Sequence, residues 1–158
     1  MIILGIDPGS AKIGWGIIKT TKNLKSIIKT IDYGSIETSK EFTCEERLQT
    51  LYNELVKIIK KFKPDLSVVE QLFFFRNAKT AMGVAQARGV ILLALQKSKI
   101  KIEEFTPLQI KMALTGYGRS SKSEVQKKVK STLKLKQIPR PNHAADALAA
   151  CVCYCKNN

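Results

Sequence analysis

Acidic residues are scarce in this chain. There are 13 Asp and Glu against 27 Lys and Arg, which gives a formal net charge of +14 at pH 7. A surplus of this size says more about binding partners than about the fold, and it favours a polyanion. Nucleic acid is the first candidate and an anionic membrane surface is the second.

The chain also lacks a long hydrophobic segment. No stretch reaches the ~18 apolar residues that a membrane span needs. The apolar run that starts at Ile2 stops at Asp7, and the basic start and small-residue cleavage site of a signal peptide are missing. We therefore expect no association with a membrane and a cytoplasmic location. The hydrophobic content of 44% excludes a disordered chain, and 158 residues suit one domain that spans residues 1–158.

Residues that bind zinc are few. The chain has one His and four Cys, and three of the thiols, Cys151, Cys153 and Cys155, follow one another at every second position. On the predicted terminal helix Cys151 and Cys155 share a face, and Cys153 points elsewhere. No second cysteine pair or histidine cluster completes a zinc set, so we expect reduced thiols that pack as small apolar groups.

Short apolar runs bounded by turn residues predict strands, and apolar residues at helical spacing predict helices. The first three strands are joined by short polar segments and should form an antiparallel meander. The predicted elements are strands at 2–7, 13–19, 26–36, 66–70 and 101–105, and helices at 44–62, 77–97, from Pro107 and from Asn142. This order predicts an α/β fold with a mixed five-stranded sheet flanked by helices, in which the fourth strand pairs in parallel with the first.

The helix predicted at 77–97 is apolar or small almost all round. A helix of this kind must be buried on two sides. One side suits the sheet. The other is covered either by a second subunit or by the rest of the same chain, and the sequence leaves both alternatives open.

Two acidic residues end buried strands. Asp7 follows an apolar run near the start of the chain, and Glu70 ends a second run. Two carboxylates aimed at one place repel each other, so a bound cation is the natural partner. His143 and Asp146 lie three residues apart, on one face of the last predicted helix. Each signal is weak by itself, but together they predict a site for Mg²⁺ or Mn²⁺, with the imidazole slightly favouring Mn²⁺.

A one-sided basic segment runs from Lys111 to Arg140. Solvated helix faces usually mix the two signs, so this segment favours a surface that contacts phosphates. Glu124 is its only acidic residue. Its nine cations are Lys111, Arg119, Lys122, Lys127, Lys128, Lys130, Lys134, Lys136 and Arg140.

A series of short motifs resembles the RuvC family of Holliday junction resolvases, in the ribonuclease H-like superfamily. No single motif is specific, but as a set in family order they are. The motifs are G-I-D-P-G-S at 5–10, G-W-G at 14–16, V-V-E-Q-L-F at 68–73, Q-A-R-G at 86–89, P-L-Q-I-K at 107–111, T-G-Y-G-R at 115–119, K-S-E-V-Q at 122–126 and H-A-A-D-A-L-A at 143–149.

This resemblance implies a ribonuclease H-like fold and a crossover junction endodeoxyribonuclease, which resolves four-way DNA junctions in recombination and DNA repair. It implies that Asp7, Glu70 and Asp146 are catalytic carboxylates that bind Mg²⁺. The remaining catalytic position, which is Asp or His in the family, falls on His143. We expect two Mg²⁺ per site, with Mn²⁺ as a possible substitute, because two adjacent ions can activate water and stabilise the leaving oxygen.

The resemblance also implies partners. Phe73 falls where the family has an aromatic residue that stacks on a base at the junction. Lys111 and Lys122 fall at positions that contact DNA near the scissile phosphate, and Arg119 is predicted to bind DNA with them. A homodimer is expected because paired cuts across a two-fold junction need two active sites related by a two-fold axis. The family works with a branch-migration helicase, although no residue here indicates that surface.

Two rival functions belong to other classes. One is a related nuclease that cuts another substrate, such as an RNA–DNA hybrid. The other is a junction-binding protein without catalysis, which the acidic set disfavours because carboxylates beside phosphate give a pure binder no advantage. A sugar kinase or actin-like ATPase also begins with a strand, an Asp and a Gly turn, but those proteins need two such domains and this chain is too short.

Overall fold

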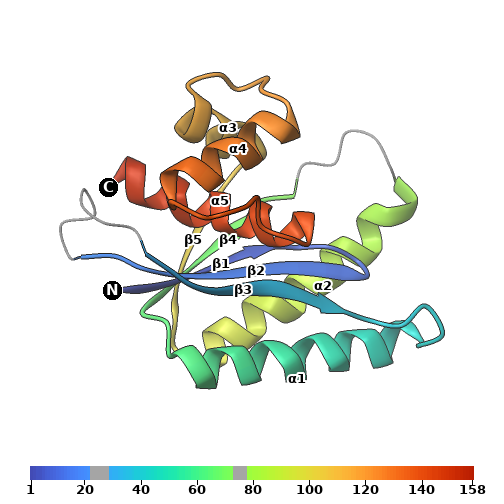
Figure 1. Cartoon of the computed structure of the whole chain (residues 1–158). Helices are drawn as coiled ribbons and strands as arrows, with labels where there is room; N and C mark the ends of the chain where they lie inside the picture. The colour runs from blue at the N-terminus through green and yellow to red at the C-terminus, as the bar shows by residue number, and fades with distance from the viewer. Residues whose placement is uncertain (22–28, 73–77) are drawn as a thin grey trace.

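The computed structural model describes residues 1–21, 29–72 and 78–158. Five strands form one sheet in the order β3-β2-β1-β4-β5 (Figure 1). The strands are β1 (Ile2–Asp7), β2 (Lys12–Lys19), β3 (Lys29–Glu37), β4 (Leu66–Glu70) and β5 (Lys101–Phe105). The helices are α1 (Cys44–Phe62), α2 (Ala78–Lys97), α3 (Pro107–Thr115), α4 (Lys122–Thr132) and α5 (Asn142–Asn157). The predicted mixed five-stranded sheet is confirmed.

Strand directions agree with the prediction. β1, β2 and β3 are antiparallel neighbours, whereas β4 and β5 join the sheet in parallel. The third strand differs in its bounds, because it continues to Glu37 instead of ending at Ile36. Glu37 pairs with Lys12 in the register of β2 and β3, and their side chains form an exposed ion pair of 3.4 Å. The predicted start at Ser26 lies outside the described residues.

The register of β1 and β4 determines where the strand-end acids lie. Ile6 pairs with Val69, so the next residues along the two parallel strands, Asp7 and Glu70, end at the same edge of the sheet. Carboxyl ends of parallel strands are where open α/β sheets bind ligands. The topology therefore brings together two acids that are 63 positions apart in the sequence.

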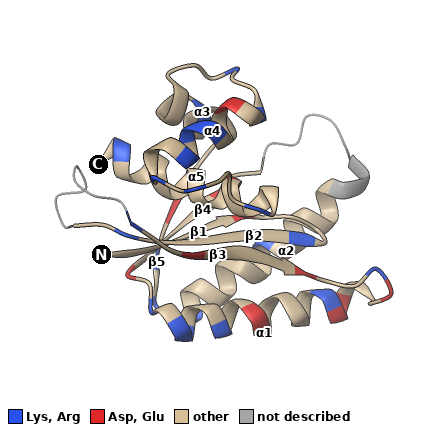
Figure 2. Ribbon diagram, in the orientation of Figure 1, with Lys and Arg blue, Asp and Glu red and all other residues tan. Residues whose placement is uncertain are grey.

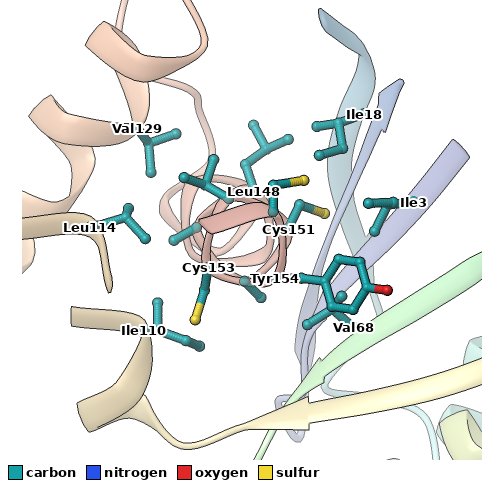
Figure 3. Packing of buried hydrophobic residues seen from close by; sticks show 14 of the residues in the cluster. Ile3, Ile18, Val68, Ile110, Leu114, Val129, Leu148, Cys151, Cys153 and Tyr154 are labelled. Carbon is teal, nitrogen blue, oxygen red and sulfur yellow. The ribbon is translucent and has the colours of Figure 1, made fainter. Parts of the chain in front are cut away.

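Helices cover both faces of the sheet. α1 and α2 lie on one face, and α5 lies on the other with α3 and α4 outside it (Figure 1). Viewed along α5, its buried side chains point both toward the sheet and toward α3 and α4 (Figure 3). Those on the sheet side face Ile3, Ile18 and Val68, and those on the other side face Ile110, Leu114 and Val129.

The prediction that the thiols pack as small apolar groups is confirmed for the three cysteines near the C-terminus, whereas Cys44, the first residue of α1, is exposed. Cys151, Cys153 and Cys155 are free and buried on α5. The Cys151 thiol lies 3.7 Å from the carbonyl oxygen of Gly16 in β2, and the Cys153 thiol lies 3.8 Å from that of Gln109 in α3. The two thiols therefore point to opposite sides of α5, as their spacing predicts.

Three of the helices begin with a capping box, in which a side chain and a backbone amide satisfy each other across the first turn. The pairs are Thr43 with Glu46 for α1, Thr106 with Gln109 for α3, and Ser121 with Glu124 for α4. The caps fix the starts of α3 and α4, which flank the edge of the sheet where β1 and β4 end.

α2 is covered on only one side by the described residues. Ala87, Ile91 and Leu95 are fully or almost fully buried, whereas Met82 and Leu93 are 69% and 55% exposed. The alternative in which the rest of the described chain covers both sides is therefore wrong.

Among the described helices, none is long and apolar enough to cross a membrane.

Candidate active site

A cleft of about 340 Å³ opens at the edge of the sheet where β1 and β4 end. The strands supply two of its lining residues, and the helices α3, α4 and α5 supply the others. The lining residues are Asp7, Glu70, Pro107, Ile110, Lys111, Lys122, Val125, His143, Asp146 and Ala149. The lining of the cleft therefore combines acidic and basic side chains with apolar ones.

Asp7, His143 and Asp146 form the closest cluster in the cleft. One possible metal-ligand atom from each residue lies within 4.8 Å of those of the other two. The Nδ1 atom of His143 is 2.7 Å from Oδ2 of Asp7, a hydrogen bond between residues 136 positions apart. This bond orients the imidazole toward the carboxylates, and it raises the pKa of His143 even though burial opposes the effect.

Asp146 has a basic partner. Nζ of Lys122 lies 2.5 Å from Oδ2 of Asp146, joining the start of α4 to the N-terminal part of α5. The Asp146 carboxyl is mostly shielded from solvent, and burial raises its pKa despite the opposing charge and hydrogen bond of Lys122. The ion pair thus compensates only part of the cost of burying this carboxylate.

Glu70 has the largest displacement of pKa in the cleft. Burial and the nearby carboxylates of Asp7 and Asp146 raise its pKa to about 8. Like charges that are held together out of water favour a shared proton or a bound cation. Glu70 lines the same cleft but lies outside the cluster of Asp7, His143 and Asp146. The acidic residues are therefore spread over a larger part of the cleft than that cluster occupies.

The donor set fits a divalent cation. Three carboxylates and one imidazole converge, and oxygen ligands of this kind suit Mg²⁺ or Mn²⁺. The raised pKa values of Glu70 and Asp146 indicate that positive charge in the cleft would relieve repulsion among them. The residues present are therefore suited to hold a metal ion.

Two predicted cations also lie at the cleft. Lys111 comes from α3 and Lys122 from α4, and both line it. Basic residues recur along α4 (Figure 2), the helix whose residues Lys122 and Val125 line the cleft. A strand of nucleic acid could therefore bring its phosphates to the acidic cluster across a cationic surface.

The structure brings together most of the predicted site residues. Asp7, Glu70, His143, Asp146, Lys111 and Lys122 all line one cleft. Arg119 is exposed on the segment between α3 and α4 and does not line it. Phe73 lies outside the described residues. The roles assigned to all these residues remain predictions.

Glycines of β1 and β2 lie against α5, although in the sequence they stand out only as parts of short motifs. A Cβ atom on Gly14 would lie 2.0 Å from the carbonyl oxygen of His143, and one on Gly5 would lie 2.1 Å from that of Ala147. Only glycine permits α5 to lie so close to β1 and β2. In the sequence, this close packing is indicated only by glycines inside predicted strands, because a glycine there often marks the close approach of another backbone.

Comparisons with known proteins agree with this geometry. The family model of the crossover junction endodeoxyribonuclease RuvC matches residues 3–154. The chain is 49% identical to the protein of this name from Fusobacterium nucleatum subsp. nucleatum over 154 residues, which cover 98% of this chain and 80% of that protein. It is 46% identical to the protein of the same name from Thermotoga petrophila, covering 98% and 92% of the two chains.

Solved structures give the same result. The chain matches Thermus thermophilus RuvC in complex with a Holliday junction substrate with a TM-score of 0.91 and 32% identity, over 99% of this chain and 94% of that one. The yeast mitochondrial Holliday junction resolvase matches with a TM-score of 0.71 and 11% identity, over 98% and 77% of the chains, and supports the fold alone. The predicted ribonuclease H-like fold is confirmed, and the chain belongs to the RuvC family.

Proposed function

We propose that this chain is a structure-selective endonuclease that resolves four-way DNA junctions by paired, metal-dependent hydrolysis of phosphodiester bonds. The observation that carries the proposal is the convergence of Asp7, Glu70, His143 and Asp146 in one cleft, which two lysines also line. The substrate is supported by relatives that are named crossover junction endodeoxyribonuclease and by a relative solved with a Holliday junction.

In this mechanism the three carboxylates and His143 would hold the metal. Bound Mg²⁺ would supply an activated water and stabilise the charge on the leaving oxygen. Asp7 orients His143 through their hydrogen bond, and Lys122, at the start of α4, holds Asp146 in place through their ion pair. Lys111 and Lys122 are positioned to balance the negative charge that builds up on the phosphate.

We propose two Mg²⁺ per site, which Mn²⁺ can replace. Two adjacent ions can serve the attacking and the leaving oxygen separately. The arrangement of the acids supports this number, because Glu70 lies outside the cluster formed by Asp7, His143 and Asp146 while lining the same cleft.

The wider assembly is also a proposal. Arg119 and Phe73 are proposed to add contacts to the DNA, and the chain is proposed to act as one nuclease domain in a homodimer. The exposed apolar residues Met82 and Leu93 on α2 are suited to contact a second copy. We further propose cooperation with a branch-migration helicase, and a location in the cytoplasm, where the free thiols would stay reduced.

Asp7→Asn tests the function by separating binding from catalysis. The amide keeps the size of the side chain but removes a charged metal ligand, so junction cleavage should fall on the order of 1,000-fold. Binding to the junction in chelator should remain near that of the unchanged protein. Asp32→Asn is the matched control, because Asp32 is a partly exposed acid on β3 that pairs with Lys61 and should not affect cleavage.

The measurements are single-turnover cleavage and fluorescence anisotropy on the same labelled four-way junction. Cleavage by Asp7→Asn at the rate of the Asp32→Asn control would remove Asp7 from the catalytic set. Binding by the unchanged protein without cleavage, in either metal, would indicate the binding protein without catalysis.

A further inference from the structure

Three apolar side chains are exposed on α3 and on the segment that follows it, next to residues that line the cleft. Leu108 and Met112 lie one turn apart on α3 and are 60% and 52% exposed, and Tyr117, in the segment after α3, is 60% exposed. A Cβ atom on Gly118 would lie 2.5 Å from Cδ1 of Leu108 and 3.8 Å from Cε of Met112. The segment that carries Tyr117 therefore lies directly against both α3 side chains. We call Leu108, Met112 and Tyr117 the apolar ridge.

The segment that carries Tyr117 is held by its own hydrogen bonds. The Thr115 hydroxyl lies 2.7 Å from the carbonyl oxygen of Lys111 and 2.8 Å from the Ser120 hydroxyl, and it accepts the amide of Tyr117 at 3.2 Å. Gly116 caps α3 with a φ of 77° and donates to the Met112 carbonyl. An exposed aromatic ring on an ordered backbone loses little entropy when it binds a partner.

The surroundings of the apolar ridge are cationic, and two of the three cations also line the cleft. Residues 106–123 contain Lys111, Arg119 and Lys122 but no Asp or Glu. Lys111 lies on α3 between Leu108 and Met112, and it also lines the cleft, as does Lys122 at the start of α4. A ligand that fits an apolar ridge bordered by cations has an apolar face and a negative charge, as a nucleotide does.

We propose that Tyr117 stacks on a nucleobase of the DNA strand whose phosphate enters the cleft, while Leu108 and Met112 pack against the adjoining nucleotide. This inference rests on the proposed function and adds a second aromatic contact to the one predicted for Phe73. The interior of a linear duplex hides the faces of its bases, whereas the centre of a four-way junction exposes the faces of its terminal base pairs. The apolar ridge thereby favours the junction over linear duplex.

Binding without metal tests this proposal directly. Tyr117→Ala should weaken anisotropy-measured binding of a fluorescein-labelled four-way junction, in chelator, by about 5- to 150-fold, the range given by loss of one base–aromatic stack. Tyr117→Phe should bind as the unchanged protein does, and so should the control Ile31→Ala, which truncates a 42% exposed apolar side chain on β3. Binding of linear duplex should change much less.

A second variant detects the stack itself. Tyr117→Trp should lose fluorescence when the junction is added, because a stacked base quenches an indole ring. Trp15 is the only native Trp, so the unchanged protein gives the background signal. If the added indole fluorescence of Tyr117→Trp stays unquenched, the stacking contact is overturned even if Tyr117→Ala binds weakly.

The outcomes distinguish this inference from the proposed function. Junction cleavage by the unchanged protein, together with unaltered binding by Tyr117→Ala, would overturn the inference alone and leave the apolar ridge to a protein partner. Equal losses on junction and duplex would overturn the claim of junction preference. An unchanged protein that neither binds nor cuts junctions would overturn both proposals.

Discussion

Glu70 shows how one residue links the fold to the chemistry. It ends a buried parallel strand, where the pairing of β4 with β1 places it at the same edge of the sheet as Asp7. Burial, together with the charges of Asp7 and Asp146, raises its pKa to about 8. At neutral pH and without a cation, the protonated form of this carboxyl is therefore favoured. A divalent ion would replace the proton, so metal binding and proton release should be linked.

The pKa of Glu70 predicts the pH dependence of stability. Its ordinary value is 4.5 and its folded value is about 8, so between these limits the folded protein keeps a proton that the unfolded chain has lost. The free energy of unfolding of metal-free protein should therefore fall as pH rises from about 5 to 8. The raised pKa values of Asp146 and His143 act in the same direction.

Thermal unfolding in chelator across this pH range measures the effect. Glu70→Gln cannot ionise and should lose much of the dependence, while Mg²⁺ should raise the melting temperature most at the alkaline end. The chain has one His, so few other groups titrate in this window. A melting temperature that rises with pH in chelator would contradict the environment assigned to Glu70.

At the scale of elements, the close packing of α5 against the sheet positions half of the site. α5 supplies His143 and Asp146, while β1 supplies Asp7. The glycines of β1 and β2 set the distance between these elements, because a side chain there would meet the backbone of α5. The hydrogen bond of Asp7 to His143 depends on that distance.

Gly14→Ala should therefore impair the site without touching a catalytic side chain. The new Cβ would meet backbone atoms of His143 that cannot rotate away. Overpacking of this kind costs about 2–3 kcal/mol, or roughly 5–10 °C in melting temperature for a domain of this size. The rate of junction cleavage should fall together with the stability. This rate is measured well below the melting temperature, where the variant is folded.

Gly83→Ala is the matched control for this prediction. Its Cβ would meet only Ser10 at an ordinary distance of 3.4 Å, so stability and cleavage should be retained. Equal behaviour of the two variants would show that the close approach of α5 to β2 does not hold the site.

The sequence predicts local elements well and their mutual approach poorly. The bounds of α1 agree with its apolar spacing and with Pro64, since both signals are local. The helix between β1 and β4 predicts that these strands pair in parallel. Their carboxyl ends then meet at one edge of the sheet, so the proximity of Asp7 and Glu70 is predictable from the sequence. By contrast, the contact of Gly14 with His143 and the ion pair of Lys122 with Asp146 join distant segments, and no periodicity encodes how closely those segments pack.

At the scale of the whole molecule, the net charge and the proposed dimer bear on how the chain binds and cuts DNA. The net charge of +14 favours binding to a phosphate backbone, and the cleft places acids within that cationic surface. Resolution of a four-way junction also requires two such clefts. The uncovered side of α2 is the proposed contact between them.

Leu93→Lys tests that contact. Leu93 is 55% exposed on α2, and a charge placed there would be buried in a dimer. The dimer dissociation constant should rise by about 100-fold or more, and paired cuts should become single, uncoordinated nicks. Sedimentation velocity measures the assembly, with Ile31→Lys on β3 as the control. An unaffected dimer in Leu93→Lys would place the interface elsewhere.

The most direct test of the central claim is cleavage of a four-way junction with a fixed centre, beside linear duplex and an RNA–DNA hybrid of the same sequence. Each substrate is incubated with Mg²⁺, with Mn²⁺ and with chelator. We expect paired nicks in strands of like polarity, on the junction alone and only with metal. Nicking in chelator, or cleavage of the duplex or the hybrid in preference to the junction, would contradict it.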